Sequence, residues 1–375
     1  MKPRAREAGL KLSGITGKWN AITDVPGVEV GYSTVIIGEP KDYKKPGSDF
    51  ARTGVTAILP RGHQRTAVFA GRADLNGNGE LTGTHWIDDS GFMHGPLMIT
   101  NTNSVGIVRD TTSRWMIENG YYYPLIVDGR PIEGSGYFYP AVGETWDGIM
   151  NDTNGFHINA EHVLEALGNA GTGPIEEGNV GGGTGMQCHQ FKGGTGTSSR
   201  ILPKEAGGYT VGALVQANHG FRPHFQMFGI DMYDEIKNCD PIINTFEPKP
   251  GTGSIVVVIA TDAPVLPWQL TKMCRRIPMG IGRLGGCYEN GSGDIFLAFS
   301  TANENAYTTT KSTIELLGDD MLDPIFKAVA DVTEEAILNV LFAAETMVGK
   351  EQNTLYALPQ DQVLEILGKH GKLRK

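Results

Sequence analysis

Ser254 is the residue whose place in the sequence is best suited to chemistry. It follows a flexible Gly-Thr-Gly tripeptide that ends at Gly253, and it precedes six apolar residues at positions 255–260. A short apolar run that is rich in β-branched residues and bounded by turn-forming residues is typical of a buried strand. We therefore expect Ser254 at the point where a flexible, proline-containing loop (residues 247–251) meets a rigid sheet.

Cleavage of the Gly253–Ser254 bond would give Ser254 a free α-amine beside its hydroxyl. A serine hydroxyl is a weak nucleophile without a neighbouring base, and an α-amine with an unperturbed pKa of about 7.7–8.0 could be that base. Glycine before the serine leaves room for the hydroxyl to attack the preceding carbonyl, so the chain could cut itself. The alternative is a glycine loop that leads into a core strand, and the GTGS sequence alone favours this alternative.

Two further apolar segments have polar residues at their ends. Asn218 ends the apolar segment at residues 209–218, and its amide could donate a hydrogen bond to an oxyanion. Ser292 and Asp294 precede another apolar run, and in extended backbone a spacing of two places both side chains on one face. A serine and an acid there could relay or orient protons near a nucleophile. Each motif also has a simpler interpretation when it is considered alone. An asparagine such as Asn218 is more often a turn former, and the NGSGD sequence is typical of a hairpin turn.

Other motifs give weaker signals. The glycine-rich stretch at residues 177–199 lacks the GK[ST] ending of a phosphate-binding loop, so its backbone N–H groups are better suited to an oxyanion or a substrate carbonyl. Residues 74–80 resemble the start of a calcium-binding loop, but the twelfth position is His85 instead of glutamate, which favours a tight turn. The histidines show no HExxH motif, and His219 and His224, separated by a proline, are a poor frame for a shared metal ion.

Composition limits the classes of protein to which this chain can belong. The net charge of −10 argues against nucleic acid or an anionic membrane as the main partner. We expect neither a signal peptide nor a membrane helix, because no suitable apolar segment is present. The four cysteines have no CxxC spacing, so reduced thiols in the cytoplasm are expected. A length of 375 residues allows two domains, but without a linker between the halves one large domain is equally compatible.

Alternating strand and helix patterns predict an α/β fold with sheets covered on both faces. The expected strands lie within residues 20–37, 54–60, 123–127, 209–220, 254–260 and 294–301, and residues 97–110 are expected to form a strand that leads into a helix reaching residue 118. Further expected helices lie near residues 160–167, 265–276, 323–347 and 361–367, with Asn159 as the N-cap of the helix at 160–167.

Many sequence blocks, in order, resemble one family. They include ITDVPGVEVG, LNGNGELTGTHW, ITNTNSVGIVRD, VGETWDG, EGNVGGGTGM, KGGTGTSSR, YTVGALVQAN, GSIVVVIATDAPVLPWQL and NGSGDIFLAFSTAN. The chain thereby resembles the L-aminopeptidase D-amidase/D-esterase family, which includes the β-peptidyl aminopeptidases. The resemblance runs from about residue 9 to residue 345 and is weakest at residues 220–250.

The resemblance implies a four-layer αββα sandwich, similar to the N-terminal-nucleophile hydrolases and the ornithine acetyltransferases. It implies one catalytic domain over residues 1–375 that cleaves itself into an α chain (residues 1–253) and a β chain (residues 254–375), which stay together. It also implies a homo-oligomer, with a tetramer favoured, that needs no metal or organic cofactor.

The resemblance also assigns roles to single residues. Ser254 matches the family's nucleophile, Asn218 its oxyanion-stabilising asparagine, and Ser292 with Asp294 the serine and acid beside the nucleophile. Glu144 matches the acid that receives the substrate's ammonium group.

Trp146 lies where some members of the family have a tyrosine, which leaves open whether its side chain helps to hold the oxyanion. Gly143 before Glu144 and Trp146 after it suggest a loop with one apolar wall.

The interpretation that follows is a self-processed aminopeptidase. It would release N-terminal residues, L- or in some members D- or β-residues, from short peptides, amides and esters through an acyl-Ser254 intermediate. One alternative is an acyltransferase of the ornithine acetyltransferase type, although those enzymes normally have threonine at the cut. A second alternative is a binding protein of the same fold that never cleaves, although the Gly253–Ser254 pair and its polar partners are all present.

Overall fold

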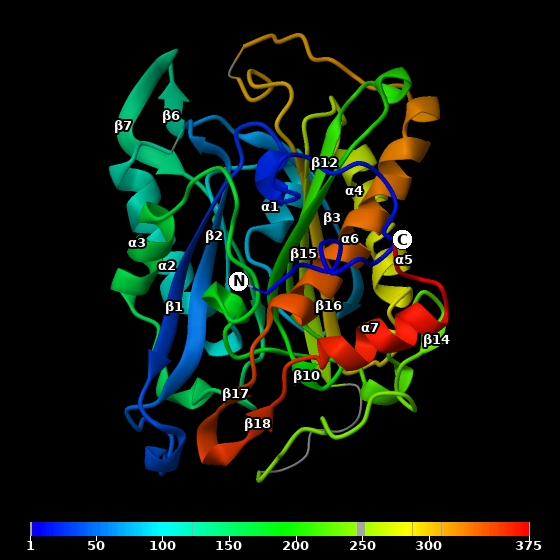
Figure 1. The fold of residues 1–375 in the computed structure, drawn as a ribbon. Coiled ribbons are helices and arrows are strands. Elements are labelled where there is room, and N and C mark those ends of the chain that lie inside the picture. The colour runs from blue at the N-terminus through cyan, green and yellow to red at the C-terminus, as the bar shows by residue number, and fades with distance from the viewer. Residues whose placement is uncertain (1, 122, 246–251, 287, 309, 375) are drawn as a thin grey trace.

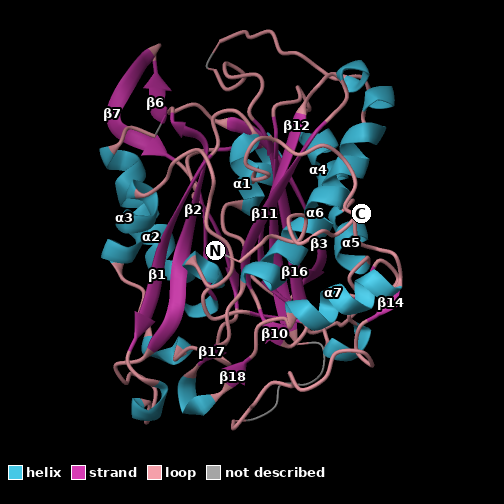
Figure 2. Ribbon diagram, viewed as in Figure 1, coloured by secondary structure: helices cyan, strands magenta, loops and turns pink. Residues whose placement is uncertain are grey.

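Two β-sheets lie face to face, with helices on both outer sides (Figure 1; Figure 2). The computed structural model describes residues 2–121, 123–245, 252–286, 288–308 and 310–374. The loop expected at residues 247–251 lies outside these ranges. No helix in the described part of the chain is long and apolar enough to cross a membrane.

The first sheet is the smaller one, and it supplies Glu144. Its four strands lie in the order β1 (Glu29–Ile37), β2 (Ala51–His63), β5 (Leu97–Asn101) and β8 (Ala141–Thr145). Only the β5–β8 pair is parallel. Helices α2 (Val105–Glu118) and α3 (Ala160–Gly168) cover its outer face and form a separate apolar layer with it.

The second sheet holds the strand that begins near Ser254. Its six strands lie in the order β11 (Gly194–Ile201), β12 (Thr210–Asn218), β15 (Gly253–Thr261), β16 (Ser292–Ser300), β3 (Val68–Gly77) and β4 (Phe92–Met93). Within it β15 and β16 are parallel, whereas β12 and β15 are antiparallel. Helices α4 (Pro267–Cys274) and α6 (Asp323–Ala343) pack on its outer face, and α5 (Ile277–Gly282) packs on α6.

Strand β15 is apolar throughout because it is buried on both faces. Ile255, Val257 and Ile259 pack in the core between the second sheet and its helices. Val256 and Val258 pack in the core between the two sheets. Helix, sheet, sheet and helix layers are thus separated by three apolar cores, which confirms the expected αββα sandwich.

The remaining elements lie around this sandwich. They are α1 (Thr84–Ser90), α7 (Gln360–Lys369), and the hairpins β6–β7 (Tyr123–Val127, Arg130–Tyr137), β9–β10 (Gln187–Cys188, Phe191–Lys192), β13–β14 (Gln226–Met227, Ile230–Asp231) and β17–β18 (Met347–Val348, Thr354–Leu355). The β9–β10 hairpin belongs to the glycine-rich stretch and lies near the end of β12.

Most expected elements are present, with informative differences. The Asn159 side chain caps α3 by accepting a hydrogen bond from the His162 N–H at 3.2 Å, as expected. The expected long helix ends at Ala343, and the following residues form β17 instead. Strand β3 was not expected, because its second half is polar and largely solvent-exposed, so that a turn at residues 74–80 was the simpler interpretation.

Candidate active site

Strand pairing places Ser254 and Asn218 side by side. Asn218 is the last residue of β12, and it lies directly opposite Ser254 in the antiparallel pair with β15. The Asn218 Nδ2 donates a hydrogen bond to the Ser254 Oγ at 3.2 Å, and both residues are buried. An amide that points its N–H group at a serine hydroxyl is suited to stabilise negative charge formed next to that hydroxyl.

Two backbone groups fix the direction of the Asn218 amide. Its Nδ2 also donates to the carbonyl oxygen of Trp146 at 2.9 Å, and its Oδ1 accepts from the Gln187 N–H at 3.0 Å. The first contact comes from the chain just after β8, and the second from β9. Because oxygen and nitrogen each have a partner of the right kind, the amide cannot rotate without losing both contacts.

Gly253 is required by the close approach of β12. A Cβ atom on Gly253 would lie 2.6 Å from the Asn218 carbonyl oxygen and 3.0 Å from the His219 Cα, both of them backbone atoms. No larger residue fits there without moving the end of β12. Glycine before the serine thus allows the Gly253–Ser254 bond to lie within the sheet, next to the asparagine amide.

Ser292 and Asp294 begin the neighbouring parallel strand. The Ser292 Oγ donates to the Asp294 Oδ1 at 2.7 Å, and both side chains are buried. In the register of β15 and β16, Gly253 pairs with Ser292, and Ser254 with Gly293. Because neighbours in register point to the same side of a sheet, Ser292 and Asp294 lie on the face opposite the Ser254 hydroxyl, beside the backbone of Gly253.

Glu144 comes from the other sheet, and the loop expected around it is wrong because Glu144 is the fourth residue of β8. Its Oε1 accepts a hydrogen bond from the Glu80 N–H at 2.9 Å, and its Oε2 accepts one from the Thr102 hydroxyl. Burial raises the pKa of Glu144, and these two hydrogen bonds oppose that effect. An ionised carboxylate has about four acceptor sites, so each oxygen can still accept from a further donor.

Residues 79–82 connect Glu144 to the Ser254 strand pair. Leu81 forms a bridge with Gly143 at the edge of the first sheet. Two residues earlier, a Cβ atom on Gly79 would lie 3.0 Å from the Glu144 Oε1 and 3.9 Å from the Gly293 Cα. The same Cβ position would lie 3.1 Å from the Ile295 Cδ1, so Gly79 packs between the Glu144 carboxylate, Ile295 and Gly293, the strand partner of Ser254.

Trp146 contributes its backbone and an exposed ring. Its carbonyl oxygen orients the Asn218 amide as described, whereas its indole lies over Gly148 and is 37% exposed. A Cβ atom on Gly148 would lie 2.2 Å from that ring. The structure thus leaves the indole partly exposed over Gly148 and places the Trp146 backbone in contact with Asn218.

Lys192 is a site residue that sequence reasoning missed. Its side chain is fully buried, and its ammonium donates to the carbonyl oxygens of Gly193 at 2.8 Å, Met186 at 2.9 Å and Gly183 at 3.4 Å. Burial lowers the pKa of Lys192 to about 7. The three carbonyls belong to the loop that carries Gln187, and through it Asn218. A lysine in a glycine-rich stretch resembles an ordinary exposed lysine, so the sequence held no signal for this role.

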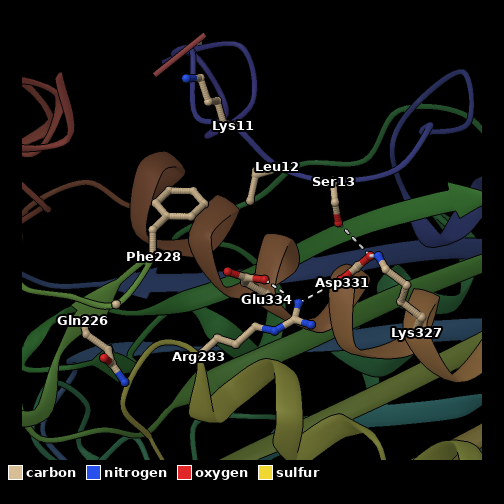
Figure 3. A pocket seen from close by; sticks show the side chains of 10 residues that line it. Lys11, Leu12, Ser13, Gln226, Phe228, Arg283, Lys327, Asp331 and Glu334 are labelled. Carbon is tan, nitrogen blue, oxygen red and sulfur yellow. Dashed lines mark hydrogen bonds and ion pairs between the residues drawn. The ribbon is translucent and has the colours of Figure 1, made fainter. Parts of the chain in front are cut away.

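A cavity of about 500 Å³ on the outer face of α6 does not contribute to this site (Figure 3). Arg283 in its wall pairs with Asp331 at 2.8 Å and with Glu334 at 2.7 Å, and Lys327 pairs with Asp331 at 2.5 Å. These charges neutralise one another. The cavity also lies on the helix side of the second sheet, whereas the Ser254 hydroxyl lies on the side of the first sheet.

Comparisons with known proteins agree along the whole chain. The model of peptidase family S58 matches residues 20–355. The beta-peptidyl aminopeptidase BapA of Sphingosinicella microcystinivorans is 46% identical over 383 residues, which covers 99% of this chain and 93% of that protein.

Two solved structures have the same fold. The L-aminopeptidase D-Ala-esterase/amidase of Ochrobactrum anthropi, described as a prototype for the serine aminopeptidases and a variant of the Ntn hydrolase fold, has a TM-score of 0.88 at 41% identity and covers 99% of this chain and 100% of its own. A β-aminopeptidase of a Burkholderia species has a TM-score of 0.83 at 41% identity and covers 99% of each chain. The chain therefore belongs to peptidase family S58, and it is a serine hydrolase with the N-terminal-nucleophile hydrolase fold.

Proposed function

We propose that this protein is an aminopeptidase that cleaves its own Gly253–Ser254 bond and then uses Ser254 as an N-terminal nucleophile. The observation that carries the proposal is the Asn218 amide, which points at the Ser254 hydroxyl and is fixed by two other hydrogen bonds. Its relatives are named for β-peptides, L-amino-acid peptides and D-alanyl esters or amides. We propose the corresponding substrates here: short peptides, amides and esters with a free N-terminal amine.

In the proposed mechanism the Ser254 hydroxyl attacks the carbonyl carbon of the substrate's N-terminal residue. The new α-amine of Ser254 accepts the hydroxyl proton, and the Asn218 N–H stabilises the oxyanion. Collapse of the tetrahedral intermediate breaks the C–N bond, and the amine returns the proton to the leaving group. Water, activated by the same amine, then hydrolyses the acyl-Ser254 ester.

The surrounding residues support this sequence of steps. Ser292 and Asp294 lie beside the backbone at Gly253, so after cleavage they would lie near the new α-amine and tune its pKa rather than replace it as the base. Glu144 has acceptor sites open on both oxygens and lies across Gly79 from the Ser254 pair. It would receive the substrate's ammonium, with the exposed Trp146 ring as one wall of the entrance.

The topology supports two chains that stay together as one catalytic domain. The segment 254–375 supplies β15 and β16, which lie between β12 and β3 of the segment 1–253. Separation of the two segments would break the hydrogen bonds of two strand pairs and expose the cores on both faces of the sheet. Assembly into a homo-oligomer, with a tetramer favoured, and a cytoplasmic location remain predictions.

The test is the chain pattern of a nucleophile variant. Wild type should give two chains on denaturing electrophoresis, the smaller one beginning at Ser254, whereas Ser254→Ala should stay a single chain of 40.4 kDa. Ser254→Cys, which keeps a nucleophile of similar size, should still cleave. The proposal is wrong if purified wild type remains uncleaved and is nevertheless an active peptidase.

A further inference from the structure

Three potential metal ligands meet in the core at the ends of β9 and β12. Cys188 ends β9, His189 follows it, and His219 follows Asn218 at the end of β12. The Cys188 Sγ and one ring nitrogen of each histidine all lie within 4.8 Å of one another. Cys188 and His189 are fully buried, and His219 is 2% exposed. The sequence predicted no metal site, because His219 and His224 are a poor frame for one and sequence spacing could not show that His189 approaches from another segment.

The two imidazoles lack the partners that buried polar groups normally have. Within the described residues, neither ring nitrogen of His219 has a hydrogen-bond partner, and the His189 ring has only a contact with the Phe221 backbone that falls outside normal hydrogen-bond geometry. Leaving a buried polar group unsatisfied costs about 1–3 kcal/mol, and such groups are rare enough to need an explanation.

The backbone holds the three ligands in place without any ion. His189 and Gln190 form the two-residue turn of the β9–β10 hairpin, and both have positive φ angles, 48° and 59°, which residues other than glycine seldom adopt. The His189 N–H donates to the His219 carbonyl at 2.8 Å. The Arg222 guanidinium donates to the carbonyls of His189 at 2.9 Å and Gln190 at 2.6 Å. A strained turn held from two sides is typical of a functional position.

Glycines keep the space around the rings open. A Cβ atom on Gly220 would lie 2.4 Å from the His189 Nδ1, and one on Gly286 would lie 2.8 Å from the His219 Cδ2. The Phe225 ring packs on His189 with centroids 4.7 Å apart, and the buried Arg222 guanidinium lies beside the same turn.

We propose that Cys188, His189 and His219 bind one zinc-like divalent cation. One thiolate and two imidazoles match the ligand preference of Zn²⁺ and fill three of its four tetrahedral positions. Binding replaces the thiol proton of Cys188, which passes to solvent, while the neutral imidazoles bind through their lone pairs. The buried site leaves no route for rapid exchange, so the ion enters as the chain folds.

This ion would affect the active site by holding nearby segments in place, and it would take no part in the reaction itself. Gln187, next to Cys188, donates to the Asn218 Oδ1, and His219 directly follows Asn218. Successive residues of a strand point to opposite faces, so the cluster lies on the face away from the Ser254 hydroxyl. An ion that joins Cys188 to His219 would link the two segments that orient the Asn218 amide.

The test uses Co²⁺ as a spectroscopic substitute for zinc. Cells that express the full chain are grown with added Co²⁺, and the metal content of the purified protein is measured by mass spectrometry together with its near-ultraviolet absorption. We expect one cobalt ion per chain and a sulfur-to-cobalt charge-transfer band, because the thiolate is a ligand. Growth with added Zn²⁺ should give one zinc ion per chain and a higher melting temperature.

Matched variants separate a site from adventitious binding. Cys188→Ser and His189→Phe should lose the bound metal and the charge-transfer band. Cys274→Ser, which removes another fully buried thiol, should keep both. The melting temperature of Cys188→Ser should no longer depend on the metal in the growth medium, which distinguishes lost binding from poor folding. Wild type without stoichiometric metal, or a Cys188→Ser protein that binds as much metal as wild type, would overturn the proposal.

Discussion

In the proposed mechanism, Glu144 is the residue on which selection for a free N-terminal amine depends. A substrate ammonium that enters a partly closed pocket loses hydration and needs an opposite charge to offset that loss. Both Glu144 oxygens are held by one protein donor each, so the carboxylate is already oriented when the substrate arrives. Charge-assisted hydrogen bonds to an oriented carboxylate are the stronger kind.

Replacement of Glu144 should therefore affect binding and leave self-cleavage intact. Glu144→Gln should still be cleaved at Gly253–Ser254 but should lose about 1.5–3 kcal/mol of charge-assisted interaction, or roughly 10- to 150-fold in kcat/KM for free-amine substrates. N-acetylated substrates should be poor for wild type and no worse for the variant. A fall of equal size for both substrate classes would mean that Glu144 is structural and that another group binds the ammonium.

The pH dependence of kcat/KM gives a second test of the role of Glu144. Burial raises the pKa of Glu144, so the carboxyl stays protonated at pH values where an ordinary glutamate is ionised. Because only the ionised form attracts an ammonium, kcat/KM for free-amine substrates should fall as pH drops through this raised pKa. The limb should lie above the usual glutamate pKa of about 4.3 and should be missing in Glu144→Gln. A limb that persists unchanged in the variant would belong to a different group.

At the scale of elements, the ends of β12, β15 and β16 bring the candidate catalytic residues together, and the β9–β10 hairpin orients Asn218. The hairpin reaches Asn218 through the Gln187 N–H, and Lys192 holds the hairpin through three carbonyl oxygens. Lys192 touches none of the reacting groups. It is a positioning residue whose effect must pass through the loop.

Loss of the Lys192 ammonium should loosen that loop. Lys192→Met keeps the apolar stem but removes three donors, and we expect slower self-cleavage and a fall in kcat with little change in KM, because Asn218 is less well fixed. Lys204→Met, at an exposed lysine, is the matched control. If the variant is less stable but its kcat is unchanged, Lys192 supports the hairpin without affecting Asn218.

The pKa of Lys192 also predicts how stability depends on pH. Lys192 has a folded-state pKa of about 7, whereas an unperturbed lysine has about 10.4. Between these values the unfolded chain binds more protons than the folded chain, so this lysine makes stability rise with pH. The free energy of unfolding of wild type, measured relative to Lys192→Met, should therefore increase from pH 7 toward pH 10. A constant difference across this range would show that the lysine stays charged.

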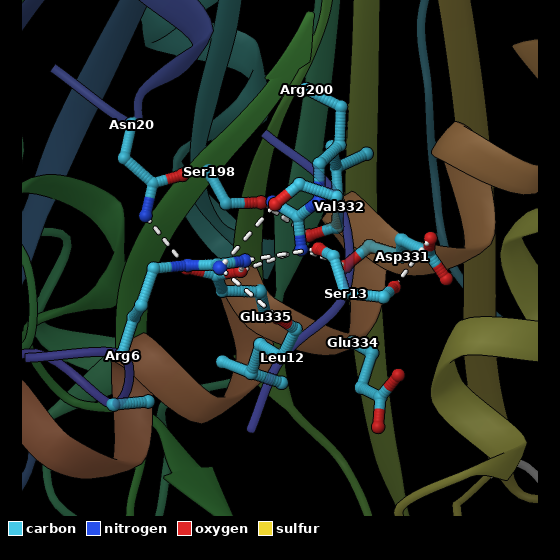
Figure 4. A network of polar contacts seen from close by, with 12 residues as sticks. Arg6, Leu12, Ser13, Asn20, Ser198, Arg200, Asp331, Val332, Glu334 and Glu335 are labelled. Carbon is cyan, nitrogen blue, oxygen red and sulfur yellow. Dashed lines mark hydrogen bonds and ion pairs between the residues drawn. The ribbon is translucent and has the colours of Figure 1, made fainter. Parts of the chain in front are cut away.

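At the scale of the whole molecule, a buried ion cluster attaches the N-terminal segment to α6 and β11 (Figure 4). The Glu335 carboxylate accepts from Arg6 and Arg200, each at 2.6 Å, and from the Asn20 Nδ2 at 2.7 Å. Burial acts to raise the pKa of Glu335, but Arg6 and Arg200 outweigh it and the net shift is downward. The cluster thus joins residues that are far apart in the sequence.

Removal of the central charge should be costly. Glu335→Gln leaves Arg200 buried without a charge partner, and breaking a buried pair in this way costs about 3–5 kcal/mol. We expect a loss of that size in the free energy of unfolding from denaturant titration, with no loss for the exposed control Glu345→Gln. Because the Glu335 pKa is lowered on folding, its contribution should also disappear as pH falls below the unfolded value of about 4.3. A variant as stable as wild type would mean that the cluster contributes specificity instead of stability.

Local sequence patterns were sufficient to place most of the candidate site residues on their elements. Ser254, Asn218 and the Ser292–Asp294 pair were each predicted at the end of an apolar strand, and each lies there. Such predictions succeed because the boundary between a turn and a buried strand is encoded within a few neighbouring residues. Strands too apolar to have an exposed face predicted an α/β fold with sheets covered on both faces, whereas the αββα layers were implied by the family resemblance alone.

Only the tertiary structure decided which of these ends meet. The register that sets Asn218 opposite Ser254 joins residues 36 positions apart, and the edge of the first sheet brings Glu144 close through Gly79. The burial of Lys192 and the approach of His189 to His219 had no local signal, because the same residue types in loops are usually solvated. Strand pairing and burial depend on contacts between distant segments, whereas sequence patterns report only what a segment prefers on its own.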